Sequence, residues 1–183
     1  MKTEYETQIL GIDKQKIIDK LIGLGAKETP EILQKRWVFD IECLNHENPG
    51  MGEWIRLRKV GEKTTITYKN KRGTAVDETQ EIEIEVEDFE KSAEILSKLS
   101  CFSGKYYQEN KRHRFVLENV EFTIDTWPKI PSFLEIEGKT EKDVEKGIEM
   151  LDLKGKESGH LGLINIYQKY GIDLHSYKEI KFD

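Results

Sequence analysis

The stretch Thr79-Gln-Glu-Ile-Glu-Ile-Glu-Val86 alternates acidic and apolar residues at every second position. Because successive side chains of a β-strand point to opposite faces, its three glutamates would share one face and its two isoleucines the other. The charged face of a single strand of this kind is usually solvated. The stretch therefore predicts a strand that has one charged and one apolar face.

The same spacing recurs along the chain with both signs of charge. The pairs at every second position are Glu4 and Glu6, Arg56 and Arg58, Arg112 and Arg114, and Glu135 and Glu137. If these strands share a sheet, acidic and basic side chains lie near one another. A closed barrel with a charged lumen and an apolar outside fits this pattern better than an open sheet. Burying so many charges is costly without a ligand.

The remaining pattern predicts the order of the elements. Strands are expected at about 3–10, 34–43, 53–60, 64–70, 79–87, 107–117, 120–126 and 133–137. Helical spacing follows Asp13 and ends at Gly23 and Gly25, and it returns at 88–100, 140–152 and 161–170. We therefore predict an α+β fold, an eight-stranded antiparallel β-barrel with flanking helices, as one domain over residues 1–183.

A two-residue turn sets the register of one hairpin. Glu118–Asn119 separates two strand-like segments, as in a tight β-hairpin. Pairing outward from this turn places Arg112 opposite Asp125 and Arg114 opposite Thr123. This register puts Arg112, Arg114, Glu121 and Asp125 on one face.

Composition excludes several classes of function. The net charge is −6 with no long run of Lys or Arg, so nucleic acid is not an expected partner. No apolar stretch approaches the roughly 20 residues of a membrane span, and we expect a cytoplasmic protein. Cys43 and Cys101 form no disulfide framework or zinc motif. The four histidines have no metal-ligand spacing, and the hairpin register points His113 away from the charged face.

The mixture of charges on these faces indicates a ligand. The acidic set is Glu4, Glu6, Glu81, Glu83, Asp125, Glu135 and Glu137, and the basic set is Arg56, Arg58, Lys69, Arg112 and Arg114. Arg and Lys bind phosphate oxygens, whereas clustered carboxylates hold a hard divalent cation that bridges those oxygens to the protein. Together they predict a metal-polyphosphate ligand.

These residues resemble the CYTH superfamily, or triphosphate tunnel metalloenzymes, in its class IV adenylyl cyclase-like and thiamine triphosphatase-like branch. The family's N-terminal Glu-x-Glu-x-Lys is matched by Glu4, Glu6 and Gln8. Its later basic strands, lysine and acidic strands are similar to Arg56-x-Arg58, Lys69, Glu81 and Glu83, Arg112-x-Arg114, Asp125, and Glu135-Ile-Glu137. The resemblance covers most of the chain, and Ser176-Tyr177 is similar to a tail of the cyclase-like branch.

The resemblance implies a tunnel of eight antiparallel strands that binds a triphosphate with Mg²⁺ or Mn²⁺. It implies Glu4, Glu6, Asp125, Glu135 and Glu137 as metal ligands, and Arg56, Arg58, Lys69, Arg112 and Arg114 as phosphate-binding residues. Catalytic roles fall on Glu4, Glu6, Gln8 and Lys69, with Glu81 and Glu83 as additional tunnel acids. The expected activity is metal-dependent triphosphate hydrolysis. An adenylyl cyclase that forms cyclic AMP and pyrophosphate is the alternative, and a homodimer is possible as in cyclase-like relatives.

Gln8 departs from the lysine of the family. A neutral amide supplies no positive charge and cannot act as a base. Three readings follow. The metal activates water unaided, Lys2, Lys71 or Lys111 substitutes for the lysine, or the protein is a sensor that binds a polyphosphate or nucleotide and turns it over poorly.

Overall fold

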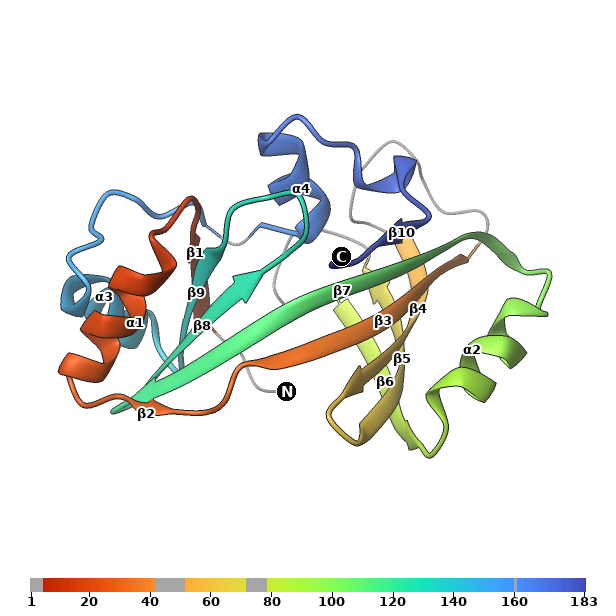
Figure 1. Ribbon diagram of the computed structural model, residues 1–183, viewed down its shortest axis with the longest axis horizontal. Coiled ribbons are helices and arrows are strands. Elements are labelled where there is room, and N and C mark those ends of the chain that lie inside the picture. Colours follow the sequence, from red (N-terminus) through yellow and green to blue (C-terminus); the bar gives the residue numbers. More distant parts are fainter. Residues whose placement is uncertain (1–4, 42–51, 72–78, 160) are drawn as a thin grey trace. The chain divides into compact units, whose positions relative to one another are not determined.

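The computed structural model describes residues 5–41, 52–71, 79–159 and 161–183 (Figure 1). The chain divides into two compact units. The first contains residues 1–32 and 111–162, and the second contains residues 33–110 and 163–183. Strand β7 (Phe102–Leu117) begins in the second unit and ends in the first.

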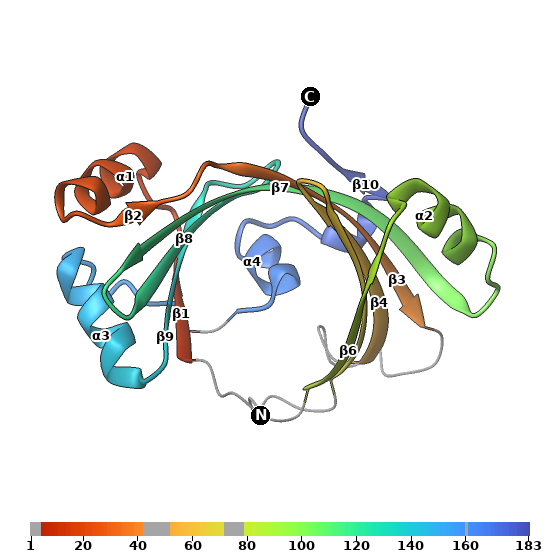
Figure 2. The same ribbon diagram turned by 90° about the horizontal axis from the view of Figure 1, so that it is seen from below.

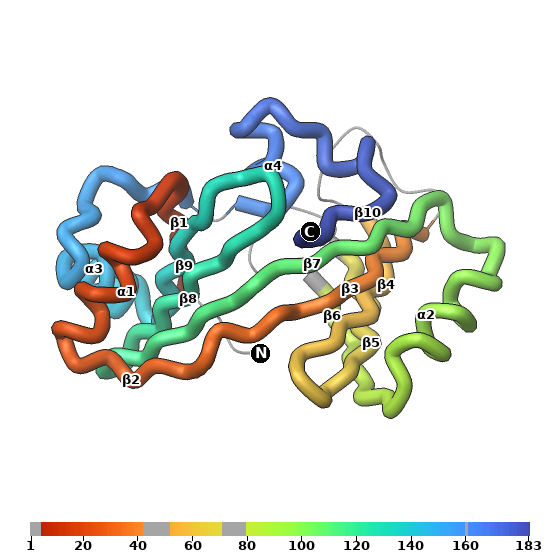
Figure 3. The backbone as a smooth tube through the Cα atoms, viewed as in Figure 1, coloured from red at the N-terminus to blue at the C-terminus, as the bar shows by residue number. Residues whose placement is uncertain are grey.

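The sheet of the first unit is antiparallel. Its strands follow the order β1 (Tyr5–Ile9), β9 (Phe133–Gly138), β8 (Val120–Thr126) and the second half of β7. The short β2 (Lys27–Glu28) also pairs with β7. Figure 3 follows the chain from β7 through the tight hairpin turn into β8 and β9. Three neighbouring strands of this sheet therefore come from one continuous segment.

Two helices cover one face of this sheet. These are α1 (Lys14–Gly23) and α3 (Glu141–Met150), which lie on the same side of the strands (Figures 1 and 2). Their apolar stripes meet the inward side chains of the strands in one core: Ile9, Ile17, Leu21, Phe115, Val120, Phe122, Ile124, Leu134, Ile136, Val144, Ile148, Leu151 and Leu153. The core covers one face, so the alternate side chains form the opposite, polar face.

Capping side chains define where the two helices begin. Asp13 accepts a hydrogen bond from the backbone N–H of Lys16, and Thr140 and Asp143 form a reciprocal capping box. Gly25 has a φ of 81°, which suits the residue that follows the C-cap of α1. The expected end of this helix at Gly23 is confirmed.

The second unit contains the remaining long strands. The first half of β7 is followed by β3 (Ile32–Ile41), β4 (Gly52–Val60), β5 (Lys63–Lys71) and β6 (Thr79–Val86). The described ladders of β4, β5 and β6 are antiparallel. The short β10 (Glu179–Ile180) pairs with β7 in parallel. The overall strand order therefore ends at β6 in this unit and at β1 in the other.

Helices lie on both sides of the strands in the second unit. Helix α2 (Phe89–Ser97) packs on one side through a core of Phe39, Leu57, Phe89, Ala93 and Leu96. Helix α4 (Leu163–Lys169) lies on the other side (Figure 2), and a 3₁₀ turn follows at Leu174–Ser176. The polar side of this sheet is thus the one that α4 approaches.

The α+β class and the antiparallel strands expected from the sequence are confirmed. Strand β7 begins at Phe102, five residues before its expected start, and β2 and β10 were not anticipated. Ser103 and Gly104 have low strand preference, so only pairing with a neighbouring strand makes them extended. The single domain over residues 1–183 stays a prediction.

Candidate functional site

The polar side of the first unit carries a charged surface that we term the acidic face. It consists of Glu6, Gln8, Arg112, Arg114, Glu121, Thr123, Asp125, Glu135 and Glu137. Glu6 lies opposite Glu137, which in turn lies opposite Glu121. Like charges directly opposite one another destabilise a sheet, so this row of carboxylates favours a bound cation.

Arg112 and Asp125 form the central ion pair of the acidic face. The guanidinium donates from Nε to Oδ1 at 3.0 Å and from Nη2 to Oδ2 at 2.6 Å. Asp125 is 2% exposed, whereas the Arg112 side chain is 36% exposed. The pairing expected from the hairpin is confirmed. The same guanidinium lies 3.6 Å from Glu135, so one arginine faces two carboxylates.

The carboxyl of Glu135 has a strongly raised pKa. Burial raises the pKa of its carboxyl to about 7, and the charges of Glu6 and Asp125 act in the same direction, while Arg112 opposes them. The amide of Gln8 donates to its Oε2 at 3.2 Å. This carboxyl is therefore held in surroundings that disfavour its negative charge, which a cation would reverse.

Gln8, which we expected at the position of the family lysine, is 4% exposed. Its side-chain carbonyl accepts a hydrogen bond from the backbone N–H of Leu161 at 2.8 Å. Lys111 cannot replace the missing lysine, because it alternates with Arg112 on β7 and points to the opposite face. Lys2 lies outside the described residues, and nothing is described of the Lys71 side chain.

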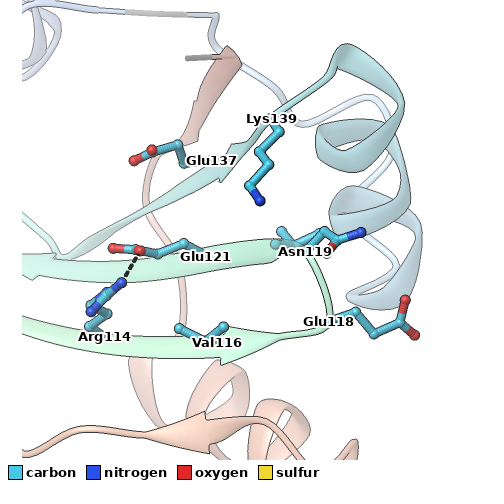
Figure 4. A pocket seen from close by; sticks show the side chains of 9 residues that line it. Arg114, Val116, Glu118, Asn119, Glu121, Glu137 and Lys139 are labelled. Atoms are coloured by element: carbon cyan, nitrogen blue, oxygen red, sulfur yellow. Dashed lines mark hydrogen bonds and ion pairs between the residues drawn. The ribbon is translucent and has the colours of Figure 1, made fainter. Parts of the chain in front are cut away.

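A pocket lies at the turn end of the acidic face (Figure 4). It has a volume of about 220 Å³ and contains Arg114, Glu121, Asn119, Glu137 and Lys139. Figure 4 shows the ion pair between the first two of these on adjacent strands. This part of the face therefore offers both cationic and anionic groups to a ligand.

The polar side of the second unit carries a surface that we term the basic face. It consists of Arg36, Arg56, Arg58, Thr65, Thr67, Lys69, Glu81 and Glu83. Arg56 lies opposite Thr67, which lies opposite Glu83, and the next pair along β5 and β6 is Lys69 and Glu81. The structure therefore brings Arg56, Arg58, Lys69, Glu81 and Glu83 together, as the alternating pattern predicts.

Charges on the basic face perturb one another. The ammonium of Lys69 pairs with Glu81, yet the pKa of Lys69 is lowered, chiefly by burial and then by the nearby Arg56 and Arg58. Thr67 donates to Glu83 at 2.7 Å, and this hydrogen bond lowers the pKa of that carboxyl. An anion at this surface would relieve the crowding of cations.

Sequence reasoning missed Arg36. It lies directly opposite Arg58, and its Nη2 donates to the side chains of Asn110 and Gln34. Asn110 is fully buried, so its side-chain oxygen holds the guanidinium in place. The signal was the polar alternation of residues 34, 36 and 40 with the aromatic side chains at 37 and 39.

Several other residues named in the sequence analysis lie outside the described part of the chain or on its core side. Glu4 lies outside the described residues, as do His46, His160 and Cys43. His113 is 8% exposed on the core side, where it contacts Glu28 at 2.7 Å, so its expected direction is confirmed. No described helix is long and apolar enough to cross a membrane.

The carboxylates of the acidic face are the type of ligand that a hard divalent cation binds. The acidic face offers carboxylate oxygens, which Mg²⁺ and Mn²⁺ prefer, and the pKa of Glu135 is raised chiefly by burial and then by the nearby charge of Glu6. In the part of the chain that the structure describes, no three such side chains already converge as metal ligands. A cation would therefore have to draw these carboxylates together or use substrate oxygens as well.

Comparison with known proteins places this chain in one family. The model of the CYTH domain matches residues 4–160. A protein of Methanocaldococcus jannaschii named "Putative adenylate cyclase" is 28% identical over 152 residues, covering 81% of this chain and 83% of that protein.

Solved structures share the fold. A protein from Pyrococcus horikoshii has a TM-score of 0.66 and 27% identity, covering 86% of this chain and 96% of that one. A protein from Hippeastrum, named a "Putative adenylyl cyclase" that reveals a dominant triphosphatase activity, has a TM-score of 0.61 and 14% identity. That match covers 91% of this chain and 95% of the Hippeastrum chain.

Proposed function

Because this chain belongs to the CYTH domain family, we propose that it hydrolyses a triphosphate, inorganic or organic, with the help of a divalent cation. The basic face offers cationic groups for phosphate oxygens, and the acidic face offers carboxylates for the cation. Phosphoryl transfer depends mainly on positioning and charge neutralisation, and these two surfaces offer the groups for both.

Crowding of cations on the basic face carries the proposal. Arg36 and Arg58 lie directly opposite one another, and the pKa of Lys69 is lowered by burial, Arg56 and Arg58. Like charges in this arrangement destabilise a sheet unless an anion neutralises them. Several guanidinium groups and an ammonium on adjacent strands match the dispersed negative charge of a polyphosphate.

The acidic face would hold the cation. Its ligands would be drawn from Glu6, Asp125, Glu135 and Glu137, with Glu4 as the sequence predicts. When bound, the cation supplies Lewis-acid stabilisation of charge on phosphate oxygens. Arg112 holds Asp125 in one orientation through two hydrogen bonds, and this would fix that carboxylate for a ligand role.

The chain's own cations would bind the phosphates. Arg56, Arg58 and Lys69 would contact phosphate oxygens on the basic face, and Arg112 and Arg114 would do so on the acidic face. Charge that develops on these oxygens during transfer is stabilised by groups already in place. The Glu81 and Glu83 carboxylates would keep the lysine and the neighbouring threonine oriented.

Gln8 restricts the mechanism. Its amide neither carries charge nor takes up a proton, so the attack of water would not use residue 8 as a base. The dominant triphosphatase activity named for the Hippeastrum protein supports hydrolysis as the first candidate.

An adenylyl cyclase is the second candidate. The name of the Methanocaldococcus jannaschii relative, which is 28% identical, favours it. In that reaction the ribose 3′-hydroxyl, not water, attacks the innermost phosphorus. Both reactions would use the same phosphate-binding and metal-binding groups, so their products distinguish them.

Simultaneous measurement of phosphate, pyrophosphate and cyclic AMP tests the proposal. Purified protein receives tripolyphosphate, ATP or thiamine triphosphate with Mg²⁺ or Mn²⁺. Release of phosphate that disappears in Glu135→Gln supports the triphosphatase, and formation of cyclic AMP with pyrophosphate supports the cyclase. Tight binding without turnover would indicate a sensor, and no binding of any triphosphate would reject the proposed function.

Neighbouring residues on β4 provide the matched control. The side chains of Arg58 and Lys59 point to opposite faces of the sheet, because successive side chains of a strand alternate. Arg58 belongs to the basic face, and Lys59 lies on the other side. Arg58→Gln should lower kcat/KM by at least about tenfold, the factor for a lost charge-assisted hydrogen bond. Lys59→Gln removes the same charge from the chain and should leave kcat/KM unchanged.

A further inference from the structure

The Gln8 side chain is buried, and other groups of the protein already occupy its hydrogen-bonding atoms. Gln8 is 4% exposed, and both ends of its amide have partners. The nitrogen donates to Glu135 at 3.2 Å, and the oxygen accepts from the backbone N–H of Leu161 at 2.8 Å. A neutral amide is the only common side chain of this length that donates at one end and accepts at the other.

The backbone of Gln8 is joined to the same segment. Its N–H donates to the carbonyl of Gly159 at 3.1 Å, and its carbonyl accepts from the N–H of Ser158 at 2.7 Å. These bonds occupy the outer edge of β1, away from β9. Gln8 and Glu135 therefore form a pair without backbone hydrogen bonds between them, in which side chains of neighbouring strands lie close together.

From these contacts we propose that Gln8 is a positioning residue, whose amide bridges the carboxyl of Glu135 to the segment that contains Ser158, Gly159 and Leu161. It orients a carboxyl of the acidic face and fixes this segment along β1. The role in catalysis rests on the proposed function, whereas the bridge itself does not.

The bridge makes residue 8 unsuited to lysine in this chain. A lysine can donate to Glu135 but cannot accept from Leu161, so the N–H of Leu161 would lose its partner. Gln8→Lys therefore restores the family residue and breaks half of the bridge. It should not raise the rate of triphosphate hydrolysis above that of the wild type.

Three substitutions separate the two ends of the amide. Gln8→Lys keeps a donor for Glu135, Gln8→Glu keeps an acceptor for Leu161, and Gln8→Met keeps neither. Residue-resolved amide exchange by NMR reports the acceptor end. Exchange at Leu161 should accelerate by about tenfold or more in the Lys and Met variants, as expected for one lost buried hydrogen bond, and stay slow in the Glu variant.

Ser158 provides an internal reference in every variant. Its N–H donates to the backbone carbonyl of residue 8, which no substitution removes. Gln15→Lys, on the exposed side of α1, serves as a control for the added charge. Equal acceleration at Ser158 and Leu161 in the Lys and Met variants would show general loosening of β1 and would overturn the proposal.

Binding of Mn²⁺ without substrate reports the donor end. Followed by electron paramagnetic resonance, Gln8→Met should weaken Mn²⁺ binding by about 10-fold, the usual effect of losing a partner that orients a metal-binding side chain. Unchanged Mn²⁺ affinity, or slow Leu161 exchange in Gln8→Lys, would overturn the proposal. Amide exchange requires neither metal nor turnover, so it decides the bridge even if the wild type hydrolyses no triphosphate.

Discussion

Arg36 on β3 lies directly opposite Arg58 on β4, and Asn110 accepts a hydrogen bond from the Arg36 guanidinium. Two like charges in this arrangement are unfavourable alone and favourable toward an anion. A substitution of Arg36 therefore tests directly whether the basic face binds an anion. No sequence motif marked this residue.

We expect Arg36→Gln to weaken tripolyphosphate binding by about 10- to 100-fold, the range for a lost charge-assisted hydrogen bond. Calorimetric titration measures the change. Lys35→Gln is the control, because Lys35 is exposed and lies opposite Lys59 on the other side of the strands. Equal affinities for the two variants would contradict a ligand role for Arg36.

Two ion pairs of the acidic face should differ in their contribution to stability. Asp125 is buried, so Asp125→Asn leaves the Arg112 charge with only Glu135, 3.6 Å away, as a counterion, and should cost about 2–3 kcal/mol of unfolding free energy, reduced by the partial exposure of Arg112. Glu121→Gln removes the partner of Arg114 from a pair that is more exposed than Arg112 and Asp125, and should cost less than about 1 kcal/mol. Urea denaturation compares them, and similar losses would contradict the difference in burial.

Glu135 predicts a pH dependence of stability in the metal-free protein. The folded carboxyl has a pKa of about 7, raised from 4.5, chiefly by burial. Between these values folding takes up a proton, so the free energy of unfolding falls as pH rises through this window and levels off above it. Glu135→Gln removes this loss and should be more stable than wild type by about 3 kcal/mol at most at pH 8, with little difference at pH 4.5.

Urea denaturation in the presence of EDTA measures both curves. Glu145→Gln, on the exposed side of α3, should follow the wild-type curve. A gap between Glu135→Gln and wild type that stays constant with pH would show that burial does not disfavour the charge of Glu135.

Gly147 on α3 should not tolerate a side chain. A Cβ there would lie 2.7 Å from Ile136 Cγ2 and 2.9 Å from Val120 Cγ1, both on buried residues. Gly147→Ala gains about 1 kcal/mol of helix preference but overpacks the core by about 1–3 kcal/mol, so a net loss of about 1 kcal/mol is expected. Thermal unfolding tests this, with exposed Lys142→Ala as control. A stabilised Gly147→Ala would refute the close packing.

Local pattern carried much of the information about fold and site. Alternation in the segment 79–86 predicted a strand whose three glutamates share a face, and the turn at Glu118–Asn119 predicted that Arg112 pairs with Asp125. These predictions succeed because side-chain alternation and tight hairpin turns are properties of a short segment.

Contacts between distant segments could not be predicted in this way. Gln8 forms hydrogen bonds with Glu135, which is 127 residues away in sequence, and with Leu161, which is 153 residues away. Nothing near Gln8 in the sequence marks either partner. The sequence alone determined the alternating strands, the helix caps and the charged character of both faces. Only the tertiary structure decided that Arg36 opposes Arg58 and that Gln8 bridges two segments, because strand pairing and burial depend on the whole chain.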